Sequence, residues 1–75
     1  MNIFLNGVET KIENNSLYTL LESLHILEKR FAVEINSNII PSSNYKEAQL
    51  TENDRVEIVI AVMYQINMEV MLFHR

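Results

Sequence analysis

Apolar and polar residues change their spacing along this chain, and each change marks a different predicted element. A short apolar run at residues 3–5 is followed by Asn6-Gly7 and then by residues 8–12, Val-Glu-Thr-Lys-Ile. Asn-Gly favours the two-residue turn of a β-hairpin, because both residues tolerate a positive φ. The pattern therefore predicts two antiparallel strands at the start of the chain.

Leucines at spacings of three and four predict a helix after this hairpin, because such spacing places them on one helix face. The series consists of Leu17, Leu20, Leu21, Leu24 and Leu27. Ser16 suits the N-cap, since its hydroxyl can accept a hydrogen bond from a free amide of the first turn. We expect the helix to span residues 17–28 and to end near Lys29-Arg30, whose positive charges suit its negative end.

The second half of the chain shows strand patterns. Residues 31–36 form a third predicted strand, and residues 39–40 form a short one that Pro41 ends, because proline cannot donate to a central ladder. The polar residues 41–53 predict a loop, with one helical turn near residues 45–48. Alternation in residues 56–62 predicts the last core strand. Its core-facing residues are Val56, Ile58, Ile60 and Val62.

The order of these elements predicts an α+β fold. A hairpin, a helix, two short strands, a loop and a long strand suit a mixed sheet of four to five strands packed on one helix, which is the β-grasp arrangement. In that topology the first and last strands lie parallel at the centre of the sheet. The length of 75 residues allows one domain. We expect residues 1–62 to form it and residues 63–75 to be an atypical C-terminal tail.

Composition and charge exclude several classes of protein. Ten acidic against six basic residues give a net charge of -4. The basic pair Lys29-Arg30 is too little for a nucleic-acid partner. The absence of cysteine excludes disulfides and thiolate metal sites. The chain has no apolar run of about 18 residues, so no membrane span is predicted. No secretory signal is recognisable either, so we expect a cytoplasmic protein.

Residues that could perform catalysis are sparse. His25 and His74 are far apart in sequence and show no metal-ligand spacing. The acidic residues have no paired spacing that suggests acid–base catalysis, and a single glycine cannot build a phosphate-binding loop. We therefore expect no catalytic residues, no metal, no cofactor and no enzyme activity of the chain by itself.

Several segments together resemble the ThiS family, the sulfur-carrier proteins of thiamine biosynthesis with a ubiquitin-like β-grasp fold. The likeness covers residues 1–62 in order. Its segments are Asn2–Gly7, Leu20–Leu24, Phe31–Asn36, Ile39–Pro41 with Tyr45, and Asn53–Val59. The resemblance implies two partners, a ThiF-like adenylating enzyme and a thiazole synthase. It also implies that sulfur is carried as a C-terminal thiocarboxylate.

The family's chemistry takes place after a Gly-Gly pair that follows the last strand. Glycine suits this position because, lacking a Cβ, it lets the tail thread into a partner's active site. Here the pair falls at Tyr64 and Gln65. Two functions follow: a sulfur carrier with an altered end, or a binding module that only docks on the adenylating enzyme or thiazole synthase. The tail is either native or the product of a shifted reading frame.

Alternation in the last strand also predicts a binding surface. The residues opposite its core-facing positions are Glu57, Val59, Ala61 and Met63. The resemblance implies that this outer face binds the activating enzyme. The alternative is an ordinary scatter of apolar residues on the surface.

The apolar alternation continues into the tail at every even position from Tyr64 to Leu72. Taken literally, this predicts one strand of about 17 residues, well beyond the usual length of about 5–6. Such a strand exposes unpaired edges that can pair with another copy of the chain. A frayed or loosely docked terminus is the alternative.

Overall fold

The computed structural model describes the backbone of residues 1–64 and 69–74 and the side chains of residues 1–61. Six strands, one α-helix and one 3-10 helix follow one another in these ranges. They are β1 (Asn2–Leu5), β2 (Val8–Lys11), α1 (Leu17–Ser23), β3 (Phe31–Ile35), β4 (Asn38–Ile40), η1 (Ser42–Asn44), β5 (Arg55–Tyr64) and β6 (Glu69–His74). No helix in the described part of the chain has the length and hydropathy needed to cross a bilayer.

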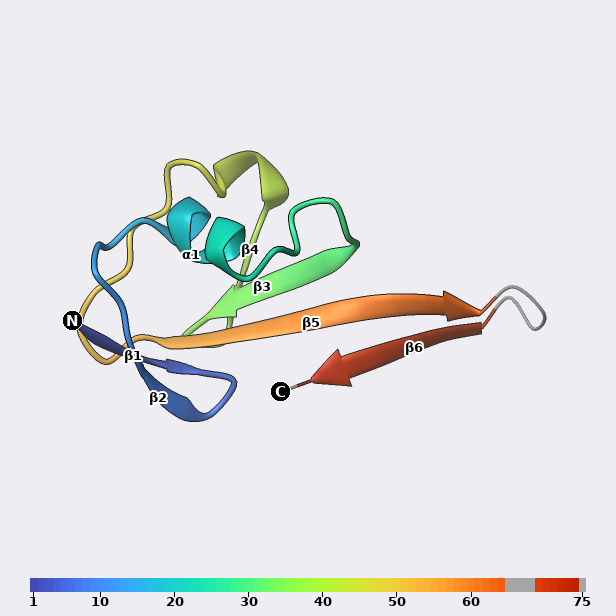
Figure 1. Cartoon of the computed structure of the whole chain (residues 1–75), viewed down its shortest axis with the longest axis horizontal. Coiled ribbons are helices and arrows are strands. Elements are labelled where there is room, and N and C mark those ends of the chain that lie inside the picture. The colour runs from blue at the N-terminus through green and yellow to red at the C-terminus, as the bar shows by residue number, and fades with distance from the viewer. Residues whose placement is uncertain (65–68, 75) are drawn as a thin grey trace.

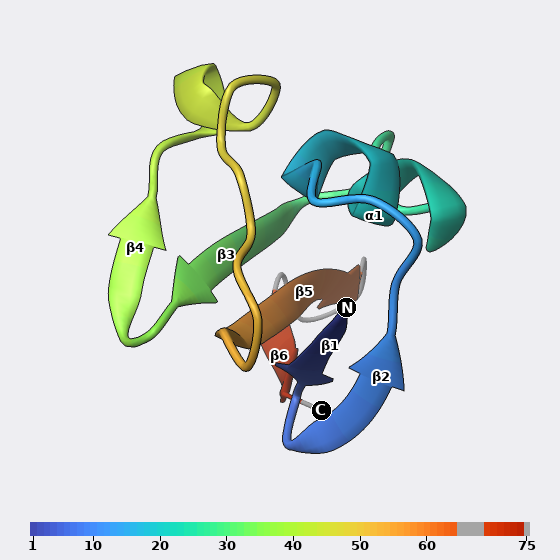
Figure 2. The same cartoon turned by 90° about the vertical axis from the view of Figure 1, so that its left-hand side faces the viewer.

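All six strands belong to one mixed sheet. The strand order is β2-β1-β5-β3-β4, and β6 pairs with β5 outside this path. β1 runs parallel to β5, with Leu5 opposite Val56, and β3 runs antiparallel to β5 on its other edge. Figure 2 shows α1 lying across one face of this sheet. The predicted α+β β-grasp fold, with its first and last core strands side by side, is confirmed.

Two tight turns join the paired strands of the sheet. Asn6 and Gly7 have φ values of 48° and 84°, and Asn36 and Ser37 have 51° and 72°. Positive φ at both central residues is the type I′ geometry, whose twist matches that of the flanking strands. The first turn closes the β1–β2 hairpin as predicted, and the second closes the β3–β4 hairpin.

The helix begins as predicted and ends earlier. Ser16 is its N-cap, and the Ser16 hydroxyl accepts a hydrogen bond from the Thr19 amide at 3.2 Å. The predicted end near Lys29-Arg30 is wrong, because His25 takes a left-handed φ of 59° directly after the cap residue Leu24. This conformation turns the chain away from the helix axis. Leu24 is exposed, and Ile26, which follows His25, is buried in the core.

The core lies between α1 and the inner face of the sheet. Each fully buried aliphatic side chain contributes about 1.5–3 kcal/mol relative to exposure. The buried set is Ile3, Leu17, Leu20, Leu21, Ile26, Val33, Leu50, Val56 and Ile58. The predicted positions Val56 and Ile58 belong to it, and Ile60 packs against it while partly buried. Val62 lies outside the range of described side chains.

The long loop before β5 is fixed to the core at one point. Leu50 is 1% exposed, and its amide donates to the Asn15 carbonyl at 2.7 Å. Earlier in the loop, Tyr45 stacks on Phe31 of β3 with ring centroids 5.4 Å apart. The predicted helical turn occurs slightly earlier, as η1. The loop is therefore held by the buried Leu50 and by the partly buried Tyr45.

The described part of the tail, residues 63–64 and 69–74, forms the end of β5 and a returning strand. β5 ends at Tyr64, and β6 returns antiparallel along it, from Tyr64 opposite Glu69 to Val59 opposite His74. The strand is thus not continuous over about 17 residues, and Glu69–His74 is paired rather than frayed. β1 leaves the edge of β5 after Val56. The returning strand satisfies the backbone groups further along that edge. Residues 65–68 lie outside the described residues.

Candidate docking face on β5

The outer face of β5 is the candidate site. Val56 and Ile58 point into the core, so the alternating residues Glu57, Val59 and Ala61 lie on the face opposite α1. All three are half-buried. The structure therefore brings three of the four predicted site residues together on one surface. The fourth, Met63, has its backbone in β5 opposite Val70, and its side chain lies outside the described range.

Carboxylates gather at one end of this face. Glu34 of β3 lies directly opposite Glu57 in the strand register, and Phe4 of β1 lies opposite Arg55. Phe4, Arg55 and Glu57, together with Gly7, line a shallow hollow of about 300 Å³. This end of the face therefore combines an aromatic ring, a guanidinium and two carboxylates.

The other end of the face is made of small apolar residues. Val59 lies opposite Ala32 of β3, and Ala61 follows it along β5. On the other edge of β5, the backbone of β6 passes Val59 at His74 and Ala61 at Leu72. The contributions of β1 and β3 to this face are not predictable from sequence spacing, because only the strand register shows which residues lie beside Glu57 and Val59.

One side chain takes the place of a strand at the middle of β5. The Ile58 amide donates to Asn6 Oδ1 at 2.7 Å, and Asn6 Nδ2 donates to the Ile58 carbonyl at 3.3 Å. The backbone nitrogen of Asn6 also donates to the Val56 carbonyl at 2.8 Å. Asn6 therefore extends the pairing of β1 by one rung, and it fixes the backbone between Glu57 and Val59.

A second polar cluster fixes the start of β5. Asp54 accepts hydrogen bonds from the Thr51 amide, the Thr51 hydroxyl and the Asn36 side chain, at 2.9–3.0 Å. The Arg55 amide in turn donates to Asn36 Oδ1 at 3.0 Å. Partial burial alone would raise the pKa of Asp54, but the three hydrogen bonds outweigh it and lower that pKa. The cluster ties the β3–β4 turn to the first residue of β5.

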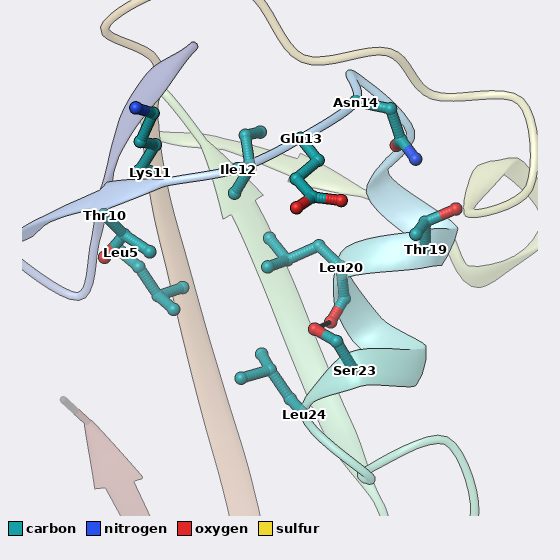
Figure 3. A pocket seen from close by; sticks show the side chains of 10 residues that line it. All are labelled: Leu5, Thr10, Lys11, Ile12, Glu13, Asn14, Thr19, Leu20, Ser23 and Leu24. Carbon is teal, nitrogen blue, oxygen red and sulfur yellow. Dashed lines mark hydrogen bonds between the residues drawn. The ribbon is translucent and has the colours of Figure 1, made fainter.

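A separate apolar pocket lies between the first hairpin and the helix. Figure 3 shows Leu5, Leu20 and Leu24 pointing into it, while the amine of Lys11 points away. Its volume is about 340 Å³. The pocket holds no histidine and only one carboxylate, that of Glu13, so its lining offers no catalytic pair.

The remaining predicted positions are not brought together. Tyr64 is the last residue of β5 and lies opposite Glu69, while Gln65 is outside the described residues. His25 is exposed after α1, and the backbone of His74 ends β6. Among the residues that the structure describes, no group of three His, Cys, Asp or Glu side chains is placed to hold a metal ion.

Comparison with known proteins gives a family match and a match to a solved structure. The model of the ThiS family matches residues 3–63 of this chain. The crystal structure of the thiamine biosynthesis protein (ThiS) from Geobacter metallireducens superimposes with a TM-score of 0.68 at 22% identity, covering 77% of this chain and 90% of that one. No curated protein matches the chain. The family match runs from β1 to the last residues of β5, and it includes the whole candidate face.

Proposed function

Because this chain belongs to the ThiS family, we propose that it acts as a sulfur carrier in thiamine biosynthesis, as a cosubstrate of enzymes rather than as an enzyme. The observation that carries the proposal is the match over residues 3–63, which spans the β-grasp body from β1 into the end of β5. In this function a ThiF-like enzyme adenylates a C-terminal carboxylate, sulfur replaces one oxygen to give a thiocarboxylate, and a thiazole synthase consumes it.

The outer face of β5 is the proposed surface for docking on these enzymes, through Glu57, Val59, Ala61 and Met63. Its central residues Val59 and Ala61 are apolar and lie in a strand whose backbone is fixed by neighbours. Glu34 and Glu57 lie side by side at one end. A partner surface with an apolar centre and a basic rim complements this arrangement in shape and charge.

A second candidate function is favoured by the backbone around Tyr64. Threading into an active site needs a narrow and unpaired tail, which glycine provides best. Here the family's glycine positions are Tyr64 and Gln65, and each residue from Val59 to Tyr64 has a pairing partner in β6. With this hairpin closed, the chain is a binding module that docks on the enzymes without carrying sulfur.

The intact mass of the protein distinguishes the two functions. The full chain is incubated with ATP, a ThiF-like enzyme and a sulfur donor. A mass gain equal to the replacement of one oxygen by sulfur supports the carrier, and an unchanged mass supports the binding module. A variant with Tyr64→Gly and Gln65→Gly that ends at residue 65 is the positive control, because it restores the family's terminus.

Docking is tested separately by calorimetric titration of the full chain with the ThiF-like enzyme. Val59→Asp places a charge at the centre of the face and is expected to weaken binding by about tenfold or more. Val8→Asp is the matched control, because Val8 is 65% exposed on β2 and lies outside the face. Equal binding by Val59→Asp and the unmodified chain would reject the proposed surface, whatever the mass experiment shows.

A further inference from the structure

The Asn6-Gly7 turn combines a reactive sequence with an unusual set of contacts. The Asn6 side-chain amide both donates to and accepts from Ile58, and the residue has a left-handed φ of 48°. Gly7 follows it with a φ of 84°. A glycine after asparagine leaves the next backbone nitrogen unhindered, because no Cβ shields it.

We propose that Asn6 is a site of spontaneous deamidation whose rate depends on whether its side chain is bound to Ile58. The reaction needs only water, so it proceeds without an enzyme. The backbone nitrogen of Gly7 attacks Cγ of Asn6, a new N–Cγ bond forms, the Cγ–Nδ2 bond breaks, and ammonia leaves with the proton of the Gly7 amide. Water then opens the cyclic imide at either carbonyl and gives aspartate or isoaspartate.

The folded structure opposes the first step. Attack requires the side-chain Cγ of Asn6 to turn towards the backbone nitrogen of Gly7. Both polar atoms of the Asn6 side chain are instead held on β5, at 2.7 and 3.3 Å from the Ile58 backbone. Turning the side chain breaks both hydrogen bonds and leaves the part-buried Ile58 groups without this partner. The reaction is therefore slow while β1 and β5 stay together, and it becomes fast when they separate.

The product cannot restore the original contacts. An aspartate at position 6 has no amide hydrogen for the Ile58 carbonyl and places a negative oxygen beside it. Isoaspartate also adds one carbon to the backbone of a two-residue turn. Either product loosens β5 between Glu57 and Val59. Each opening of this edge thus carries a risk of permanent change next to the proposed docking face.

The second hairpin turn supplies an internal control. Asn36 has the same turn position, with a φ of 51°, and its side chain also makes two hydrogen bonds, with Asp54 and the Arg55 amide. Its following residue is Ser37, whose Cβ hinders the same attack. Asn36 should therefore react more slowly than Asn6 when the protein is unfolded.

The experiment uses the full chain, incubated at mildly alkaline pH in buffer and in concentrated urea, with peptide mapping over time. Deamidation at Asn6 is expected to be at least about tenfold faster in urea, as the loss of two hydrogen bonds implies. In urea Asn6 should react before Asn36. Equal Asn6 rates in the two solutions would overturn the protective role of Ile58, and faster reaction at Asn36 would overturn the assignment of the site.

A variant tests the consequence independently. Asn6→Asp reproduces one product, and hydrogen exchange of the Ile58 amide is expected to accelerate by about tenfold or more relative to the unmodified chain. The amide of Val33, in the β3–β4 hairpin, is the internal reference for global folding. Unchanged protection of Ile58 in this variant would contradict the proposed loss of contacts. If Val33 loses its protection as well, the same comparison is made on partly deamidated unmodified protein.

Discussion

The two ends of β5 belong to one strand, but they have different neighbours in the structure. Residues 55–60 have β3 along one edge and β1, Asn6 and then β6 along the other, and their inner face contacts the core. At Ala61 the backbone amide still donates to the Arg30 carbonyl. Further along β5, β6 is the only strand that pairs with it among the described residues. In Figure 1 this second part extends with β6 beyond α1 and β3.

This difference bears on the proposed docking face, because Glu57 and Val59 lie in the first part and Ala61 and Met63 lie in the second. The first part of β5 is held from both sides, so it can present a rigid surface to a partner. In the proposed carrier function the second part leads towards the C-terminal chemistry, and its backbone is paired with β6. We therefore expect Glu57 and Val59 to keep their positions even where the end of the strand is changed.

The largest expected difference between the two parts of β5 is their response to a proline substitution. Ile58→Pro removes the amide that donates to Asn6 and distorts the centre of the sheet, so the domain should lose about 3 kcal/mol or more and unfold. Leu72→Pro changes β6 opposite Ala61 and should leave the urea midpoint of the body nearly unchanged. Circular dichroism in urea measures both. A shared loss of folding would show that β6 belongs to the same cooperative unit as the body.

An intermediate effect is expected from Asp54 at the start of β5. Its folded pKa lies below its unfolded value, so its contribution to stability is present above the unfolded pKa and is lost as pH falls through the folded pKa. Asp54→Ala should cost about 1 kcal/mol at neutral pH, because three hydrogen bonds are removed near the surface. The cost should shrink in acid. Urea titrations at pH 7 and pH 3 measure it, and a cost that stays constant with pH would contradict this account.

The smallest effect is expected at the end of α1. His25→Gly removes the penalty of a left-handed conformation in a residue with a Cβ, and it should raise the free energy of unfolding by about 0.5–1 kcal/mol. Glu22→Gly, inside the helix, should lower it by a similar amount. Thermal unfolding compares the two. The pairing of β5 with β6 should not respond to either change, and a stabilising Glu22→Gly would refute the assigned end of the helix.

Local signals predicted the elements whose geometry a few neighbouring residues determine. Asn6-Gly7 specified its turn, Ser16 its cap, and the alternation of β5 its two faces. The helix end was missed because no glycine or proline marks it. His25 takes the conformation that glycine usually takes. The burial of Ile26 follows the change of chain direction at that residue.

Long-range pairing accounts for the rest of the difference. The alternation of the tail fits a strand, yet nothing in the sequence marks where the strand reverses. Likewise, Glu34 and Ala32 join the candidate face only through the register of β3 against β5. Sequence patterns assign residues to faces of their own strand, whereas neighbours across the sheet depend on the whole topology.

The attachment of the long loop at Leu50 has a practical consequence. Because that buried residue secures the crossing, the exposed turn at Ser42–Asn44 can accept a dye or a surface linker without disturbing the sheet. A molecule immobilised there would keep the two hairpin turns and the outer face of β5 open to solution. Sensor-based binding measurements would then leave the proposed docking face free to meet a partner.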